Sequence, residues 1–173
     1  MAAVVLAEGA CRAKPAKAAS RWRSLAHVGG TSEQRPVFVY GTLRPGQPNW
    51  DRLLAGWSER TVSGRLAEVV LLDCGRYPAA LERPGGGGAD GEVVLIRPDA
   101  FPEVLAALDH LEGYEPADPD RLFDRVIRPV ETAEGPVECW VYLAGPMLAG
   151  SGRPVVAGGD WVAHLVQPGP PGE

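Results

Sequence analysis

VFVYGTL, at residues 37–43, is the first stretch of this 173-residue chain in which an apolar run ends at a glycine. The run follows Pro36 and is apolar or aromatic throughout, which predicts a short buried strand. Turn-forming residues then continue from Gly41 to Pro48, so an irregular loop is expected until about Trp50. Because glycine has no Cβ, successive main-chain N–H groups in this loop could hold a carboxylate or a developing oxyanion. The alternative interpretation is a simple turn.

Beyond this loop the sequence predicts more strands than helices. Short apolar runs bounded by glycine and proline are typical of buried strands. Such runs occur at residues 57–72, 92–96, 123–130 and 137–143, and the last two are expected to form a hairpin around the turn residues 134–136. The other expected features are turns at Gly75 and at Tyr77-Pro78, a flexible loop at Gly85–Gly88, and a short helix beginning near Asp160.

One segment has the periodicity of an amphipathic helix. The i, i+3, i+4, i+7 positions of its apolar stripe are occupied by Phe101, Val104, Leu105 and Leu108. Asp99 is the expected N-cap, and Gly113 is the expected stop. The sequence therefore predicts a helix of about three turns between these two residues.

Glu112 lies on the apolar stripe of this helix. Each helical residue advances by about 100°, so eleven residues after Phe101 the direction returns to within about 20°. Burial and the unpaired carbonyls of the last turn both disfavour a charged carboxylate, so its pKa is expected to be raised toward neutrality, which suits proton transfer. Asp109 falls at the edge of the stripe, where a surface charge is expected. The alternative is that Glu112 lies at a frayed helix end, in solvent or paired with Arg125.

Composition and charge exclude several classes of protein. Hydrophobic residues make up 45% of the chain and charged residues 23%, as in ordinary globular domains. The net charge of −5 argues against nucleic acid as a partner, because that affinity comes from clustered Lys and Arg. No apolar run reaches the roughly 20 residues that span a bilayer, and the three cysteines include no C-x-x-C pair. A cytoplasmic protein with reduced thiols and no membrane association is expected.

The length fits one domain with additions at both ends. Residues 1–34 show no sustained hydrophobic period and are expected to form a flexible N-terminal extension. Residues 35–166 are expected to form the domain, and residues 167–173, which are rich in proline and glycine, a C-terminal tail.

The order of several short motifs resembles the γ-glutamylcyclotransferase family, including its γ-glutamylamine cyclotransferase and avirulence-induced-gene-like (AIG2-like) branches. The resemblance covers residues 36 to about 165. It is carried by VFVYGTL at 37–43, GRYPAAL at 75–81, GEV at 91–93, LDHLEGY at 108–114, FDR at 123–125, WVY at 140–142 and GDW at 159–161. This chain departs from the family pattern at Phe123, where tyrosine is commoner, in a longer insert at residues 115–121, and in its N-terminal extension.

The resemblance implies an α+β fold, a small mixed β-barrel with flanking helices. It implies an enzyme that cyclises a γ-glutamyl amine or γ-glutamyl amino acid to 5-oxoproline and releases the free amine, with Glu112 as the catalytic acid/base. The implied substrate-binding residues are Tyr40, Gly41, Thr42, Leu43 and Tyr142, without a metal or other cofactor. The alternative function is a non-catalytic protein that binds a small ligand on the same fold. The amine attached to the γ-glutamyl group and the oligomeric state cannot be deduced from the sequence.

Overall fold

The computed structural model describes residues 34–166. The elements, in chain order, are β1 (Val37–Val39), α2 (Trp50–Leu53), β2 (Ser58–Leu66), β3 (Val69–Asp73), β4 (Pro78–Glu82), β5 (Ala89–Ile96), α3 (Phe101–Glu112), β6 (Phe123–Thr132), β7 (Val137–Ala144), α4 (Pro146–Ala149), the 3₁₀ turn η1 (Ala157–Gly159) and α5 (Trp161–Val166). The extension expected at residues 1–34, apart from its last residue, and the tail expected at 167–173 lie outside the described residues.

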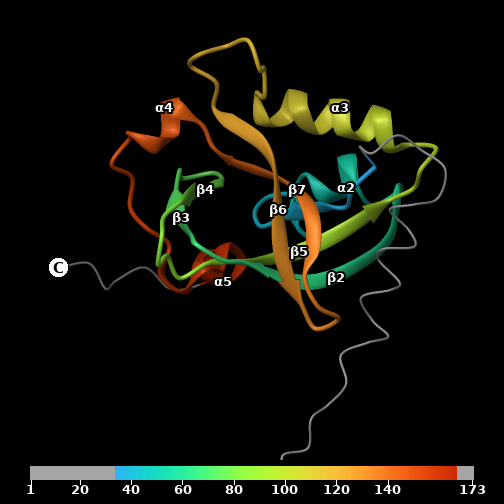
Figure 1. Cartoon of the computed structure of the whole chain (residues 1–173), viewed down its shortest axis with the longest axis horizontal. Coiled ribbons are helices and arrows are strands. Elements are labelled where there is room, and N and C mark those ends of the chain that lie inside the picture. Colours follow the sequence, from blue (N-terminus) through green and yellow to red (C-terminus); the bar gives the residue numbers. More distant parts are fainter. Residues whose placement is uncertain (1–33, 167–173) are drawn as a thin grey trace, which may run out of the picture.

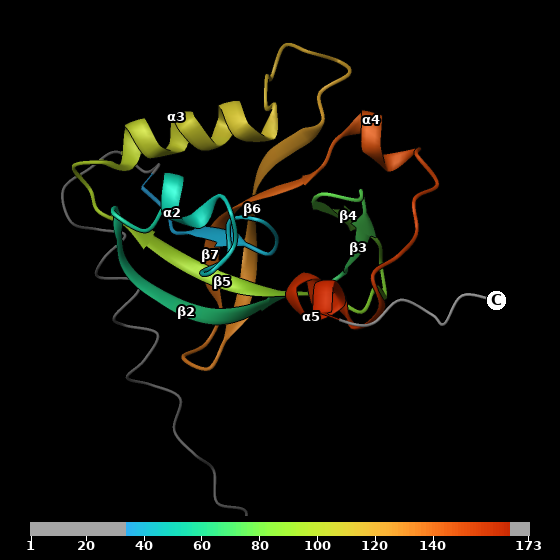
Figure 2. The same ribbon diagram turned by 180° about the vertical axis from the view of Figure 1, so that it is seen from behind.

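Five strands close into a barrel in the order β1-β5-β2-β6-β7. The single parallel contact, between β1 and β7, joins the two ends of the sheet, whereas the other neighbours run antiparallel. Closure leaves the barrel with no free edge. The expected mixed β-barrel with flanking helices is confirmed, and α3 lies along one side of the barrel, as Figures 1 and 2 show from opposite directions.

Strand β1 is buried on both faces, as its continuous apolar run predicts. Phe38 packs in one apolar cluster with residues of β6, β7 and Trp161 of α5. Val37 and Val39 point the other way, into a second cluster that contains the apolar stripe of α3. Because β1 contributes to both clusters, the loop that follows it begins from a fixed point.

The β3–β4 hairpin forms a separate two-stranded sheet beside the barrel, with β4 against β7. The sequence predicts turns at Gly75 and at Tyr77-Pro78, and Gly75 and Tyr77 do lie in the turn between β3 and β4, whereas Pro78 does not. Strand β4 begins at Pro78, where its partner across the hairpin is Asp73. A proline is tolerated at the first position of a strand, so it marks a boundary here and not an interruption.

Helix α3 ends as predicted but begins one residue later than predicted. Gly113 adopts φ +62°, the left-handed conformation that glycine supplies at helix C-termini. At the other end, the N-cap is Ala100, without a side-chain cap, and Asp99 instead pairs with Arg97 at the surface. With 12 residues α3 is the longest described helix, and none between residues 34 and 166 is long and apolar enough to span a membrane.

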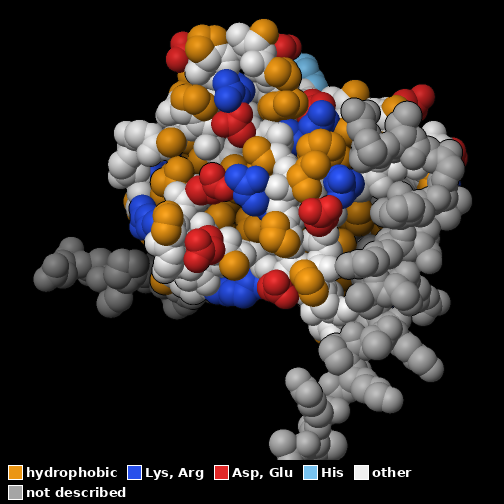
Figure 3. All heavy atoms as spheres, viewed as in Figure 1, with side chains coloured by type: hydrophobic (Ala, Val, Ile, Leu, Met, Phe, Trp, Pro, Cys, Tyr) orange, Lys and Arg blue, Asp and Glu red, His pale blue; other side chains and the backbone are white. Residues whose placement is uncertain are grey.

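The outer face of β6 carries acidic and basic side chains interspersed, with apolar atoms between them (Figure 3). Ion pairs link neighbouring elements on this side of the molecule, including Arg128 of β6 with Glu82 of β4. Arg35, just before β1, pairs with Glu138 of β7 at 2.8 Å. These pairs are partly exposed, so each contributes little to stability.

Gly91 is predicted to tolerate no side chain. A Cβ added there would lie 2.2 Å from the carbonyl oxygen of Val39 and 2.8 Å from the ring of Phe38. Gly91→Ala should lower the free energy of unfolding by more than about 2 kcal/mol, because the main chain of β1 must shift to accept the methyl group. Urea denaturation measures this, with Gly87→Ala as the control, since a Cβ at Gly87 meets nothing within 4 Å. Equal denaturation midpoints for the two variants would contradict the close approach of β1 and β5.

Candidate active site

Gly41 is required at the end of β1 by a contact from the β3–β4 hairpin. A Cβ at this position would lie 2.7 Å from both Cγ and Cδ of Pro78. Pro78 is the first residue of β4, so the hairpin packs directly on the glycine. Two motifs that are far apart in the sequence, VFVYGTL and GRYPAAL, are therefore in contact, and the contact fixes the path of the loop.

The loop from Gly41 to Leu43 presents unused main-chain donors. Two of its carbonyls are engaged, because Gly41 accepts from the N–H of Arg44 at 3.1 Å and Thr42 accepts from the N–H of Asn49 at 3.0 Å. Among the hydrogen bonds between residues 34 and 166, none uses the N–H of Gly41, Thr42 or Leu43 as its donor. Consecutive N–H groups of this kind form a site that suits an anion or a polarised carbonyl oxygen.

A small cavity of about 40 Å³, hereafter the inner cavity, brings the predicted site residues together. It is lined by Phe38, Val39, Tyr40, Gly41, Thr42, Leu43, Tyr77, Pro78, Glu112 and Tyr142. All six site residues that the sequence and the resemblance indicated are in this set. The carboxyl-bearing end of α3 and the loop after β1 therefore line the same cavity.

Glu112 is the last residue of α3, and its half-buried side chain lines both the cavity described above and a neighbouring one. Within residues 34–166 it forms no ion pair, and the described ion-pair partner of Arg125 is Asp109. Burial raises the pKa of Glu112 to about 7. The carboxyl group can therefore gain and lose a proton near neutral pH, as the sequence predicts for a carboxylate on an apolar stripe.

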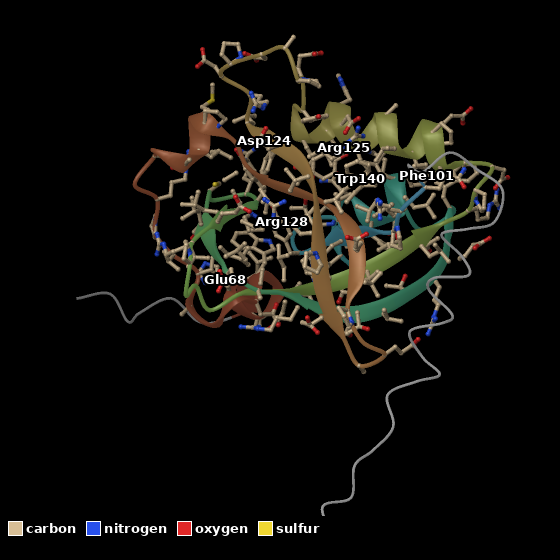
Figure 4. All side chains as sticks on the ribbon, viewed as in Figure 1. Glu68, Phe101, Asp124, Arg125, Arg128 and Trp140 are labelled. Atoms are coloured by element: carbon tan, nitrogen blue, oxygen red, sulfur yellow. The ribbon has the colours of Figure 1, made fainter. Side chains whose placement is uncertain are left out.

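Asp109, which the periodicity places at the surface, instead belongs to a partly buried network. Its Oδ2 accepts from Arg125 of β6 at 2.8 Å, and its Oδ1 accepts from the hydroxyl of Tyr142 of β7 at 2.7 Å. The Arg125 guanidinium lies between the rings of Tyr114 and Trp140, 5.0 and 4.8 Å from their centroids. Figure 4 shows Arg125 and Trp140 close together beneath α3. The network joins the C-terminal turns of α3 to two barrel strands and so fixes Glu112.

Tyr40 and Tyr142 line the inner cavity with their hydroxyl groups already engaged. The Tyr40 hydroxyl donates to the main-chain carbonyl of Tyr142 at 2.6 Å and accepts from the N–H of Ala80 at 3.2 Å. Burial raises the pKa of both tyrosines, so both remain protonated at neutral pH. Their rings can shape the cavity, while their hydroxyl groups hold β1, β4, β7 and α3 together.

Arg44 holds the loop in place, a role that the sequence analysis missed. Its guanidinium binds both carboxylate oxygens of Glu92 at 2.8 and 2.9 Å, and its third nitrogen binds Asp160 at 2.7 Å. Asp160 also accepts from the N–H groups of Val162 and Ala163 in the first turn of α5. Three motifs, at residues 37–43, 91–93 and 159–161, therefore converge on one arginine. The signal available in the sequence was two acidic residues in separate motifs without an assigned partner.

A larger cavity of about 250 Å³, hereafter the outer cavity, adjoins the inner one. Its lining residues are Thr42, Asn49, Arg76, Tyr77, Leu111, Glu112, Leu122 and Phe123. Thr42, Tyr77 and Glu112 line both cavities, so Glu112 stands where the two meet. The described part of the chain has no group of three or more His, Cys, Asp or Glu side chains arranged to hold a metal ion.

Comparison with known families finds one match that covers most of the chain. The family model described as "Gamma-glutamyl cyclotransferase, AIG2-like" matches residues 37–163. This range begins at the first residue of β1 and ends within α5, so it contains the whole barrel and every residue that lines the two cavities.

Individual relatives agree with this match. A Bos taurus protein named gamma-glutamylaminecyclotransferase is 38% identical over 116 residues, which are 62% of this chain and 64% of the relative, slightly less than two thirds of its length. The crystal structure of a Mus musculus AIG2-like protein superposes with a TM-score of 0.53 at 26% identity, covering 70% of this chain and 85% of that one. YkqA from Bacillus subtilis superposes with a TM-score of 0.57 at 23% identity, covering 76% of this chain and 40% of that one, and shares the fold.

The raised pKa of Glu112 predicts that the difference in free energy of unfolding between the wild type and Glu112→Gln changes with pH. The folded state holds this proton up to about pH 7, whereas the unfolded chain releases it near pH 4.5, so the group's stabilising contribution is lost as pH rises between these values. Replacing Glu112 by Gln removes this loss. The free energy of unfolding of Glu112→Gln relative to wild type should therefore increase by up to about 3 kcal/mol from pH 4.5 to 7.5, measured by urea denaturation. A difference that does not change with pH would show that the carboxyl group is solvated.

The Asp109 network predicts energetic coupling between α3 and β7. Asp109→Ala removes the only described ion-pair partner of Arg125 and should destabilise the fold by about 3 kcal/mol, whereas Tyr142→Phe should cost about 1 kcal/mol. The double variant should show a coupling of about 1 kcal/mol in denaturation experiments. Asp99→Ala is the control, because its ion pair with Arg97 is exposed and should contribute less than about 0.5 kcal/mol. Strict additivity of Asp109→Ala and Tyr142→Phe would mean that the 2.7 Å hydrogen bond does not contribute.

Proposed function

Because the chain belongs to the gamma-glutamyl cyclotransferase, AIG2-like family, we propose that it converts a γ-glutamyl amine or γ-glutamyl amino acid to 5-oxoproline with release of the free amine. Glu112 acts as the general acid/base in this reaction. The observation that carries the proposal is the position of Glu112, whose pKa is raised to about 7, across the inner cavity from the unused N–H groups of residues 41–43.

The glutamyl part of the substrate binds on the loop after β1. The N–H groups of Gly41, Thr42 and Leu43 hold it and polarise the γ-carbonyl, on which negative charge develops during attack. The rings of Tyr40 and Tyr142 form apolar walls of the same cavity. Because Arg44 and Pro78 fix this loop, the donors are oriented before the substrate arrives, which suits transition-state stabilisation.

The reaction is an internal aminolysis. The neutral α-amine of the glutamyl unit attacks the γ-carbonyl carbon, and a new C–N bond closes the five-membered ring. The Glu112 carboxylate accepts the proton that the attacking nitrogen loses, and it returns this proton to the departing nitrogen as the original amide bond breaks. No water is consumed, and the proton is returned, so the enzyme ends in its starting state.

The substrate supplies its own nucleophile, so the protein has no need of a covalent nucleophile or cofactor. Holding the glutamyl chain in a folded-back conformation makes the reaction unimolecular, which can be worth about 7–11 kcal/mol when the geometry is ideal. The small size of the inner cavity supports this function, because a narrow space restricts the conformations of a small flexible chain. A protein that only binds a ligand would gain nothing from an unpaired carboxyl group with a raised pKa at that position.

Replacing Glu112 by Gln should lower the rate of 5-oxoproline release by about 10²- to 10⁴-fold, the usual contribution of general acid–base catalysis. In the wild type, kcat/KM should fall as pH decreases below about 7, because the protonated group cannot accept the proton of the α-amine. Both quantities can be measured by mass spectrometry of 5-oxoproline formed from a panel of γ-glutamyl amines and γ-glutamyl amino acids.

Glu103→Gln provides a matched control, because Glu103 is an exposed glutamate in the first turn of the same helix. Its activity should equal that of the wild type. Unchanged turnover in Glu112→Gln would remove this residue from the mechanism. Tight binding of the whole panel by the wild type without any turnover would instead favour the alternative function, a small-ligand-binding protein.

A further inference from the structure

The outer cavity has a defined position relative to the proposed reaction. A γ-carbonyl between the loop after β1 and Glu112 would have its glutamyl carbons in the inner cavity. The departing nitrogen must lie close to Glu112, because it receives the proton there. Since Glu112 also lines the outer cavity, the group attached to this nitrogen extends into that cavity.

The walls of the outer cavity are divided about equally between polar and apolar surface. Leu111, Leu122, Phe123 and Tyr77 form the apolar part, in which the rings of Tyr77 and Phe123 lie 6.1 Å apart. The polar side chains Asn49 and Thr42 are hydrogen-bonded to each other at 3.0 Å, so neither is left wholly unpartnered. An aliphatic or aromatic group on the departing amine would bury apolar surface against these walls.

Arg76 is the one cationic residue among the described residues that line either cavity. It is exposed, and it forms no ion pair with any residue between 34 and 166. A guanidinium group that is not already paired can bind a carboxylate with two hydrogen bonds.

The turn that carries Arg76 is well defined. The Asp73 side chain accepts from the N–H of Gly75 at 2.7 Å, and the N–H of Cys74 donates to the carbonyl of Tyr77 at 3.1 Å. Gly75 adopts φ +85°, a conformation that glycine permits and other residues rarely adopt. The main chain therefore holds Arg76 at the rim of the outer cavity beside Tyr77, and only the side chain has to order when a ligand binds.

We propose that the outer cavity is the binding site of the departing amine and that Arg76 selects amines that carry a carboxylate together with an apolar portion, that is, amino acids. This inference rests on the proposed function and adds a substrate class to it. Glu112 is the single acidic residue in the lining of the outer cavity, and unlike Arg76 it also lines the inner cavity, where the proposed reaction takes place. A cationic amine would bring a positive charge to the rim that holds Arg76, which opposes its binding.

Matched substrates test this selection. One pair is γ-glutamyl-leucine and γ-glutamyl-leucinamide, and the other is the γ-glutamyl derivatives of 6-aminohexanoate and 6-aminohexanamide. Within each pair only the carboxylate changes, and the two pairs place it at different distances from the reacting bond. The wild type should prefer the carboxylate in at least one pair by about five- to tenfold in kcat/KM, as expected for a charge-assisted contact at a partly exposed site.

In Arg76→Gln this preference should fall to about one, and in Arg76→Glu it should reverse. Arg83→Gln is the matched control, because Arg83 is an exposed arginine just beyond β4 that lines neither cavity. It should keep the wild-type preference. A merely structural role of Arg76 would lower turnover of both members of a pair equally and would overturn the inference.

Calorimetric titration of the Glu112→Gln variant separates this inference from the proposed function. If the wild type releases 5-oxoproline from both members of each pair at equal rates, the selection by Arg76 is wrong and the function stands. If the wild type releases none, the function is wrong. In that case the inference depends on the affinities measured by calorimetric titration. Tighter binding of the carboxylate member of a pair that disappears with Arg76→Gln supports the inference, and equal affinities for both members overturn it.

Discussion

The candidate site depends on one ion-pair cluster, in which Arg44 binds Glu92 through two hydrogen bonds and Asp160 through a third. The side chains of Arg44 and Glu92 are each only 15% exposed, so breaking the cluster would leave charged groups largely removed from water. Such clusters add little net stability but strongly disfavour other arrangements. Here the cluster fixes the end of β1 to the start of β5 and to α5. The N–H groups of residues 41–43 therefore keep one orientation, which an anion or oxyanion site requires.

The two carboxylates on the last turn of α3 have opposite environments, and the difference comes from a single arginine. Asp109 binds the guanidinium of Arg125 and the hydroxyl of Tyr142, whereas Glu112, three residues later, faces the cavities without an ion-pair partner among residues 34–166. If Arg125 paired with Glu112 instead, its positive charge would favour the ionised form and lower the pKa. The sandwich of Arg125 between Tyr114 and Trp140 keeps the guanidinium on the Asp109 side. By binding Arg125, Asp109 thus keeps this positive charge away from Glu112 and so helps to keep the pKa of Glu112 raised.

Patterns that arise within one element were sufficient to predict β1, α3, the β6–β7 hairpin and the inward position of Glu112. The features that the sequence analysis missed depend on contacts between elements. Asp109 was assigned to the surface because helical periodicity describes only the helix's own stripe, whereas β6 and β7 cover its edge. Strand β4 was missed because Pro78 resembles a turn residue until its partner Asp73 is known. Likewise, nothing local to Arg44 indicates that Glu92 and Asp160, 48 and 116 residues away, converge on it.

The architecture separates the parts to which the cyclisation is assigned by our proposal from the part proposed to select the amine. The loop after β1 and the end of α3 are fixed to a closed barrel, so a change in either would disturb the packing of several strands. Arg76 and Tyr77 lie instead on the turn of a two-stranded sheet outside the barrel, where Arg76 is exposed. Substitutions at an exposed turn usually change stability by less than about 0.5 kcal/mol. The rim of the outer cavity can therefore vary while the cyclisation site stays constant, so specificity for the departing amine can change without a change in the reaction.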